Sequence, residues 1–180
     1  MGLIFGLLPL SFAQGASKEA SLRVAFVYNF IKFTEWPNQT SSPSLRLCVL
    51  GADHDAKEAL IPLNRQPVIT QKIDGKPVVK QSVDVVFLDD PANTLQQLKS
   101  CHILYRPARA APIAVPDPLP MGVLLIADDP DPAETNVSIA LRRSRDGRIE
   151  FSISTAAVNV AGVNISSQLF KLAKNSQGGK

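Results

Sequence analysis

The sequence lacks the residue patterns that most catalytic and cofactor sites need. Only two histidines, His54 and His102, occur among 180 residues, so a serine–histidine or cysteine–histidine catalytic pair has few candidates. The GxGxxG and GxxxxGKS/T motifs of nucleotide-binding loops are absent, as are the closely spaced cysteine pairs of zinc sites. We therefore expect a protein that is not an enzyme, with no catalytic residues, no cofactor and no metal.

Long apolar runs and clusters of one charge are also missing. No apolar run reaches the ~18 to 20 residues that span a bilayer, so the mature chain is not expected to cross a membrane. The formal net charge is +3, from 19 basic and 16 acidic residues, but the basic residues are scattered singly. No basic tract is interleaved with aromatic residues, which argues against a nucleic-acid partner.

The first 16 residues, MGLIFGLLPLSFAQGA, contain no charge and are typical of a secretory signal peptide. Small residues around 11–13 have the spacing of a signal-peptidase site. The usual positively charged start is missing, so a start further upstream is an open alternative. A buried N-terminal helix or strand is the other alternative, but two glycines and a proline would interrupt it. We expect an exported chain with a signal peptide over 1–16, a domain over 17–176 and a flexible tail over 177–180.

The segment after the signal peptide has the apolar spacing of one helix face. Apolar residues stand at 22, 25, 26, 30, 33 and 36, and further ones widen the stripe. The pattern predicts a helix from about Ser17 to about Glu35, with Ser17 as N-cap and Pro37 forbidding continuation. Such a helix would be buried on more than one side.

The rest of the chain alternates strands with helices. A strand over 45–51 ends in glycine and precedes a helix over 55–63, which has capping-box spacing between Asp55 and Glu58. Two or three strands fit within 67–88, turned at Asp74-Gly75. A helix begins at Asp90-Pro91 and a short strand covers 101–105. Strand–glycine–helix units of this kind indicate an α/β fold.

A proline-rich segment over 106–122 interrupts this alternation, because it holds five of the 14 prolines, and we expect an irregular surface loop there. A buried strand over 122–129, a strand pair turned at Asp146-Gly147 and a helical segment from Thr155 with a break at Gly162 complete the chain. The predicted fold is α/β, a single compact domain with a mixed sheet flanked by helices.

The two cysteines lie in predicted strands. Cys48 falls within the first strand and Cys101 begins a later one, an even number in a chain expected to be exported. A disulfide between them would close a loop of ~50 residues and stabilise the fold by up to ~4 kcal/mol in the chain-entropy model. Two buried free thiols are an alternative, because a sequence carries no Cα separation. A metal site from Cys48, Cys101 and His102 is a third.

The remaining polar candidates have structural interpretations. His54, between two aspartates before a helix, is predicted to be solvated, with those acids serving the helix N-terminus. Ser166 and Ser167 lack the glycines of a nucleophile elbow and are predicted to cap a helix. The acidic stretch over 128–134 lacks the ligand pattern of a calcium loop, so a solvated loop is expected.

The stretch NFIKFTEWPN over 29–38 contains the only tryptophan. Phe30, Phe33 and Trp36 stand at three-residue steps, which would place them on one face of the predicted helix. One interpretation is an anchor that docks this helix on the sheet. The other is a contact surface, in which case Phe33 and Trp36 would bind a partner.

Five segments occur together in an order that resembles the YfiR-like family of bacterial periplasmic proteins, over about Arg23 to Lys174. They are AFVYNFIKFTEWP, LRLCVLG, CHILY, IEFSIS and AGVNISSQLFKLAK. The residues that match the family pattern are Trp36-Pro37, Cys48, Gly51, Cys101-His102 and Ser166-Ser167. The resemblance implies an exported, non-enzymatic α/β domain, whose best-known members restrain a membrane-bound diguanylate cyclase by binding its periplasmic part. Loss of that restraint raises cyclic di-GMP and biofilm formation, and the matched cysteines favour the disulfide.

The leading hypothesis is a periplasmic regulator that represses an inner-membrane signalling enzyme, with a diguanylate cyclase as first candidate. The chain departs from the family pattern in two loops, a longer link before CHILY and Glu134-Thr135-Asn136 in place of a glycine pair, and loops often determine partner choice. The alternative is a periplasmic sensor of a ligand or envelope component that serves a histidine kinase or transporter. A homodimer through an edge strand or the first helix is a further expectation.

Overall fold

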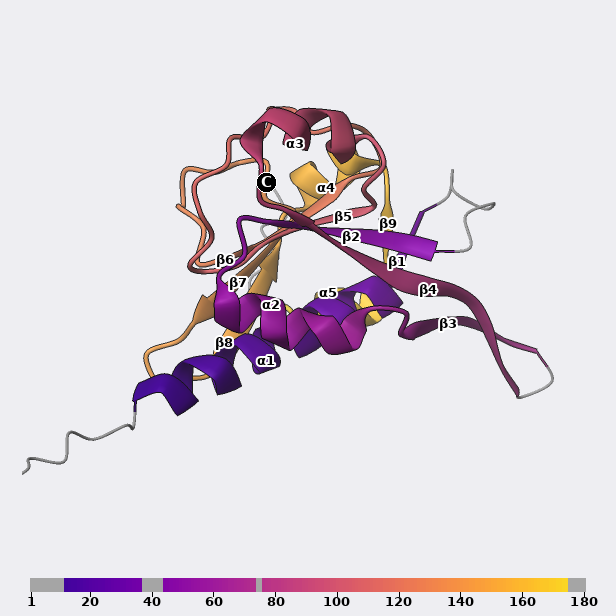
Figure 1. Cartoon of the computed structure of the whole chain (residues 1–180). Helices are drawn as coiled ribbons and strands as arrows, with labels where there is room; N and C mark the ends of the chain where they lie inside the picture. Colours follow the sequence, from indigo (N-terminus) through magenta and orange to yellow (C-terminus); the bar gives the residue numbers. More distant parts are fainter. Residues whose placement is uncertain (1–11, 37–43, 74–75, 175–180) are drawn as a thin grey trace, which may run out of the picture.

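The computed structural model describes residues 12–36, 44–73 and 76–174 and has the predicted α/β architecture (Figure 1). A seven-stranded mixed sheet forms its centre. Its strands are β2 (Ser44–Leu50), β3 (Pro67–Ile73), β4 (Lys76–Leu88), β5 (Ile103–Arg106), β6 (Leu124–Asp128), β7 (Ile139–Arg143) and β8 (Ile149–Ile153). The helices are α1 (Phe12–Lys32), α2 (His54–Leu60), the single 3₁₀ turn η1 (Ile61–Leu63), α3 (Pro91–Leu98), α4 (Thr155–Ala161) and α5 (Ser167–Leu172). A second sheet pairs β1 (Thr34–Glu35) with β9 (Asn164–Ile165).

The order of strands in the large sheet is β3-β4-β2-β5-β6-β7-β8. Strands β4, β2, β5, β6 and β7 run parallel, and the two edge strands β3 and β8 run antiparallel to their neighbours. After β2, the chain forms β3 and β4 on one side of β2. It then crosses to the other side, where β5 pairs with β2 and β6 pairs with β5. The sheet therefore reverses its direction of winding between β2 and β5, which makes this pair a topological switch point.

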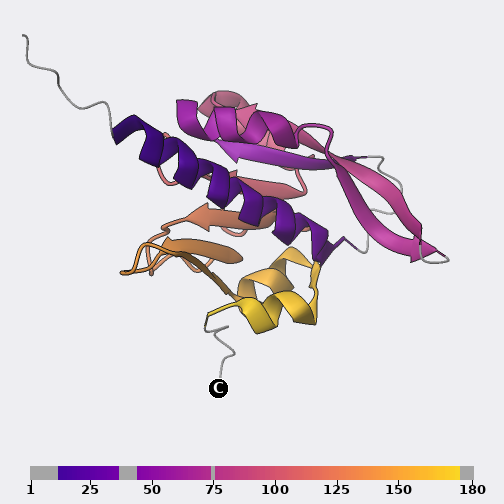
Figure 2. The same cartoon turned by 90° about the horizontal axis from the view of Figure 1, so that it is seen from below.

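Both faces of the sheet are covered, as a parallel sheet requires. Helices α1 and α2 lie on one face and α3 on the other (Figure 1). Figure 2 shows α1 crossing the strands and the β3–β4 hairpin projecting beyond the rest of the sheet. Because side chains alternate along β2, Leu47 and Val49 pack in the core under α1 and α2, and Cys48 and Leu50 pack in the core under α3. We call these two sets of buried residues the α1-face core and the α3-face core.

The proline-rich segment is irregular, as predicted, but it also covers part of the sheet. Ile113, Val115 and Leu119 pack against the α3-face core, beside Leu98 of α3. The segment connects the parallel strands β5 and β6, and its apolar side chains cover the sheet where a regular α/β unit has a crossover helix. The expectation of a loop confined to the surface was therefore incomplete.

Helix α1 has different ends from those predicted. It is already helical at Phe12, so Ser17 lies within the helix and the prediction of Ser17 as its N-cap was wrong; the helix ends at Lys32 rather than Glu35. After its last turn, the Thr34 hydroxyl donates to Phe30 O at 2.8 Å, and the backbone of Thr34 pairs with Ile165. The helix therefore ends where the backbone begins to pair with β9, a strand more than a hundred residues later in the sequence. The prediction of one helical stripe was wrong for this reason.

Most of the predicted caps are confirmed. Asp90 caps α3 by accepting from Ala92 N at 3.0 Å, and Ser166 caps α5 by accepting from Gln168 N at 3.3 Å. Gly162 ends α4 in the left-handed conformation, with φ 66°. The cap of α2 is Asp53 rather than Asp55, because Asp53 is extended and accepts from Ala56 N at 3.0 Å.

Some sequence predictions lie partly or wholly outside the described residues. They are the first part of the predicted signal peptide, the Asp74-Gly75 turn and the C-terminal tail. The two strands that flank the turn do form, and so does the strand pair turned at Asp146-Gly147. Within the described ranges, none of the helices has the length and apolar character needed to cross a membrane.

Candidate functional site

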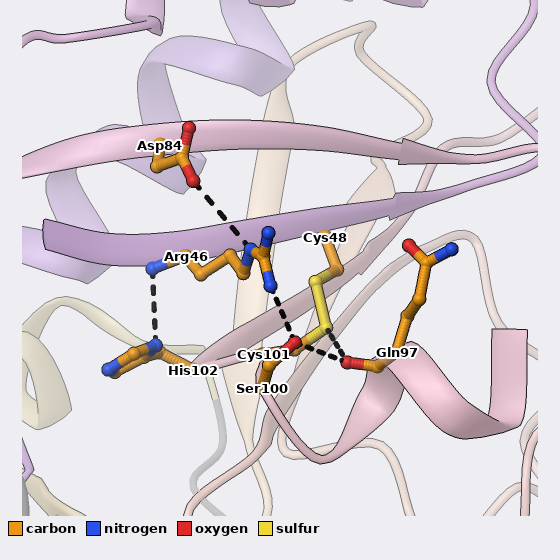
Figure 3. Close-up of a disulfide and its surroundings, with 7 residues drawn as sticks. All are labelled: Arg46, Cys48, Asp84, Gln97, Ser100, Cys101 and His102. Carbon is orange, nitrogen blue, oxygen red and sulfur yellow. Dashed lines mark hydrogen bonds and ion pairs between the residues drawn. A yellow bond between two sulfur atoms is a disulfide. The ribbon is translucent and has the colours of Figure 1, made fainter.

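The two cysteines form a disulfide that joins β2 to Cys101, two positions before the start of β5 (Figure 3). The Cα atoms of Cys48 and Cys101 are 5.8 Å apart, within the range that a disulfide spans. Both residues belong to the α3-face core, with exposed fractions of 1% and 2%. The alternatives of two free thiols and of a metal site using these sulfurs are therefore wrong.

His102 follows the disulfide directly and is buried against Arg46. Its Nδ1 accepts from Arg46 N–H at 3.1 Å, while the Arg46 guanidinium donates to Ser100 Oγ at 2.7 Å and lies 3.6 Å from Asp84 (Figure 3). Burial, helped by the charge of Arg46, lowers the pKa of His102. The ring is therefore neutral at pH 7 with its proton on Nε2, which makes no hydrogen bond within the described part of the chain. Among the described residues, no group of three or more His, Cys, Asp or Glu side chains could hold a metal ion.

Trp36 is half-buried and contacts segments that are distant in the sequence. Its Nε1 donates to Gly122 O at 3.0 Å, and its ring centroid lies 6.2 Å from that of His102 in an edge-on arrangement. Phe33 is also half-buried, and both side chains pack against the α1-face core. These contacts support the packing interpretation. The binding of a partner by Phe33 and Trp36 stays a prediction.

A pocket of about 240 Å³ lies at the carboxyl ends of β2, β5 and β6, beside the switch point. Ligands of open α/β sheets bind in crevices of this kind. The β2–α2 connection contributes Asp53, β5 and the residues after it contribute Tyr105 and Arg109, and β6 contributes Asp128. Helix α1 closes the pocket with Arg23 and with small apolar residues.

Gly51 follows β2 directly and lets the backbone approach the proline-rich segment closely. Its φ is +51°, and a Cβ at this position would stand 2.6 Å from Ala111 O. The two backbones are joined by a hydrogen bond from Ala111 N to Gly51 O at 2.8 Å. Only glycine allows this turn and this close approach together, which gives a physical reason for the glycine at the end of β2.

Buried polar groups form the floor of the pocket. Asp128 Oδ2 accepts from the Tyr105 hydroxyl at 2.7 Å and from Ala108 N at 3.2 Å. The Arg23 guanidinium donates to Glu19 Oε1 and to Asp129 Oδ2, each at 2.8 Å from Nη2. Arg23 Nη1 and Asp128 Oδ1 are 3.5 Å apart, and neither makes a hydrogen bond within the described part of the chain. The two groups therefore form a buried ion pair with each other.

Burial dominates the ionisation of this cluster. It raises the pKa of Asp128 to about 6, although hydrogen bonding from Tyr105 and the charge of Arg23 act in the opposite direction. Burial also raises the pKa of the Tyr105 hydroxyl, and the neighbouring Asp128 carboxylate adds to this. For Arg23, burial lowers the pKa, but the surrounding carboxylates outweigh it and the net shift is upward. Arg23 is therefore charged at all relevant pH values, while Asp128 titrates near pH 6.

The sequence interpretation missed this cluster. It assigned residues 128–134 to a solvated loop, but Asp128 is 5% exposed and ends strand β6. An aspartate that ends a wholly apolar run, an arginine within the apolar part of α1 and a tyrosine at the end of another strand were the available signals. Their proximity follows only from the sheet order. The solvated position predicted for His54 is confirmed, because its side chain is 83% exposed.

The fold and the site define a class of protein, a small α/β domain that carries one buried disulfide and a polar pocket at its switch point. The chain belongs to the YfiR/HmsC-like family, whose model matches residues 20–174. This match confirms the resemblance that the sequence motifs indicated. Members of this family are periplasmic regulatory proteins. The comparison with curated proteins found no match.

Proposed function

We propose that this protein is a periplasmic regulator that binds an inner-membrane signalling enzyme and represses it. A diguanylate cyclase is the first candidate, in which case the protein lowers cyclic di-GMP and biofilm formation. The observation that carries the proposal is the family match, which spans almost all of the described domain. The buried Cys48–Cys101 disulfide accords with the oxidising periplasm. Export requires the signal peptide expected over residues 1–16.

Repression of this kind needs no chemistry in the regulator. The protein must bind the inactive state of its target more tightly than the active state, since only a difference in affinity shifts a conformational equilibrium. A signal then relieves repression by reducing that difference. Phe33 and Trp36 are the proposed contact residues, because both keep part of their aromatic surface exposed after packing.

The decisive experiment is deletion of the gene, with cyclic di-GMP and biofilm measured in the deletion strain. We expect both to rise, and to fall again when the wild-type gene is restored on a plasmid. Co-purification with the periplasmic part of a membrane GGDEF protein encoded nearby should then identify the target. Unchanged cyclic di-GMP and unchanged biofilm would contradict the proposal.

A periplasmic sensor that serves a histidine kinase or transporter is the second candidate function. The pocket at the switch point favours it, because a regulator that acts only through its outer surface has no need for a polar cavity. In that case the deletion should alter the output of the kinase or transporter and leave cyclic di-GMP unchanged. For either target, a homodimer is proposed through the edge strand β3 or helix α1, and light scattering of the purified protein tests it.

A further inference from the structure

The β7–β8 hairpin carries a cluster of arginines around its turn. This segment is an exception to the single scattering of basic residues along the chain, and its four arginines, all exposed, are Arg142, Arg143, Arg145 and Arg148. Arg143 pairs with Glu19 of α1, and Arg148 pairs with Asp146 in the turn. The side chains of the other two arginines form no ion pair or hydrogen bond with any described residue.

Helix α1 adds a fifth cation beside this hairpin. Lys18 and Leu22, from the first turns of α1, line the same cleft as Arg143 and Gly147. Figure 1 shows the start of α1 next to the β7–β8 turn. Lys18 is exposed, and Leu22 keeps 48% of its surface exposed. We call Lys18 and the four arginines, together with the acidic Glu19 and Asp146, the hairpin patch.

The hairpin patch accounts for the whole formal net charge of the chain. Of the 19 basic and 16 acidic residues, the patch contains five and two, which leaves 14 of each sign elsewhere in the sequence. Two further acids beside the hairpin, Asp129 and Glu150, are paired with Arg23 and Lys174. The excess of positive charge is therefore concentrated at one end of the fold, where it attracts anionic partners.

The composition of the patch fits a lipid surface better than a protein partner. Protein interfaces are centred on a few desolvated anchors, often aromatic, and no aromatic side chain belongs to the hairpin patch. A bilayer with anionic headgroups needs no such anchor, because its charge is spread over the surface and attracts each nearby lysine or arginine. The exposed Leu22 adds an apolar contact beside the cations, a combination found at membrane surfaces.

The direction of α1 supports the same partner. The chain enters α1 at this end of the molecule after residues 1–11, which are uncharged and mostly apolar and which the sequence analysis assigns to a signal peptide. The half-buried aromatic residues proposed to contact the target, Phe33 and Trp36, follow the opposite end of α1. At 1.5 Å per residue, Lys18 and Phe33 are separated by about 20 Å along the helix.

We propose that the hairpin patch binds the anionic surface of a phospholipid bilayer. Arg142 and Arg145 are the principal contacts, because no protein carboxylate engages them. The binding is electrostatic and reversible, and each positive charge strengthens it about fivefold. Phe33 and Trp36 remain free to contact a target at the other end of α1. Binding to a bilayer requires no target enzyme, so this proposal is independent of the regulatory function.

Sedimentation with lipid vesicles tests the proposal. The processed protein, purified from the periplasm, is mixed at about 0.1 M salt with vesicles of phosphatidylglycerol and phosphatidylethanolamine, or with vesicles of phosphatidylcholine alone. We expect the protein to sediment with the anionic vesicles and not with the neutral ones. Binding should disappear at about 1 M salt, where the screening length falls to about 3 Å.

Two double variants of equal net charge locate the binding surface. Arg142→Gln/Arg145→Gln should weaken binding to the anionic vesicles about 25-fold, which is a factor of about five for each charge. The melting temperature should stay the same, because both side chains are exposed and make no contact that holds the fold. Lys32→Gln/Lys99→Gln removes two exposed charges outside the patch and should weaken binding far less.

Four results would overturn the proposal. The wild type could fail to bind anionic vesicles at low salt, or bind neutral vesicles equally well, which would indicate apolar insertion instead. Equal losses in the two double variants would show that total charge, rather than the hairpin patch, is responsible. A patch variant that keeps its vesicle binding but no longer co-purifies with a membrane target would assign the patch to an acidic protein partner. None of these outcomes depends on cyclic di-GMP, so the deletion experiment tests the proposed function separately.

Discussion

Replacing both cysteines by alanine tests how much of the stability of this domain comes from its disulfide. The bond joins residues 53 positions apart, and the enclosed segment contains α2, β3, β4 and α3. In the chain-entropy model, releasing a loop of this length increases the entropy of the unfolded chain by an amount worth about 4 kcal/mol at 25 °C. The native state should change little, because β2 and β5 are held in parallel register by their backbone hydrogen bonds.

The double variant should lose a smaller amount of stability through poorer packing of the native core. Cys48 and Cys101 are buried beside Leu50, Leu98 and Leu104, so loss of the two sulfur atoms leaves unfilled space in the α3-face core. Removal of small buried groups typically costs about 1 kcal/mol. The expected loss for the double variant Cys48→Ala/Cys101→Ala is therefore about 4 to 5 kcal/mol. At this chain length, such a loss corresponds to a fall in melting temperature of roughly 8 to 20 °C.

The assay is urea unfolding of the oxidised wild type, of the double variant and of wild-type protein that was reduced while unfolded and refolded with reductant. If the cross-link is responsible, the reduced wild type and the double variant should agree within about 1 kcal/mol, the size of the packing contribution. A double variant as stable as the oxidised wild type would refute the reasoning. A variant far less stable than the reduced wild type would show that packing, not chain entropy, dominates.

Three further substitutions test the packing of Trp36, the turn at Gly51 and the ionisation of Asp128. Trp36→Ala should lower the free energy of unfolding by about 2 to 4 kcal/mol, and Trp36→Phe by about 1, since the latter loses mainly the hydrogen bond to Gly122 O. Gly51→Ala should lower the free energy of unfolding by at least about 2 kcal/mol, because its φ is +51° and the new Cβ would clash with Ala111 O. Urea unfolding measures the stability of the Trp36 and Gly51 variants. Burial raises the pKa of Asp128 to about 6, so the folded state binds this proton more tightly than the unfolded chain. Between pH 4 and 7, the wild type should therefore lose about 2 kcal/mol relative to Asp128→Asn, measured by urea unfolding at each pH.

Each of these predictions has a matched control. Gly147→Ala shares the positive φ but meets no atom closer than 3.8 Å, so it should cost less than Gly51→Ala; equal costs would exclude the close approach as the cause. His102 has a lowered pKa and opposes Asp128 in the same pH range, but it contributes equally to both proteins and cancels in the difference. Parallel pH profiles would show that Asp128 has no raised pKa. A Trp36→Ala protein of full stability that no longer binds its target would support the contact interpretation instead.

Local features of the fold were predictable because neighbouring residues determine them. Alternation of side chains defined β2, and Asp90-Pro91 defined the start of α3, since a cap needs only a side chain and the backbone of the next turn. The cap of α2 was predicted two positions too late, because three acidic residues lie near the start of this helix. Only the extended backbone conformation of Asp53 identifies it as the N-cap. The pairing of Cys48 with Cys101 was favoured by the family motifs but not settled by them.

Features that depend on distant residues were missed. The end of α1 is decided by the pairing of Thr34 with Ile165, which no local pattern reveals. The burial of Asp128 depends on Arg23 and Tyr105, which come together only because β5 and β6 are neighbours and α1 lies across them. In the sequence, even Tyr105 and Asp128 are 23 positions apart, and the sequence carries no measure of their separation in space.

The sequence alone determined the α/β class, the positions of most elements, the even number of cysteines and the motifs of a periplasmic family. These are properties of short segments, where periodicity and capping express the local preferences of the backbone. The tertiary structure decided which strands are neighbours, where α1 ends and where the pocket lies. It also decided that the proline-rich segment packs against the α3-face core. Those outcomes depend on contacts between segments far apart in the chain, because burial and charge pairing act through space.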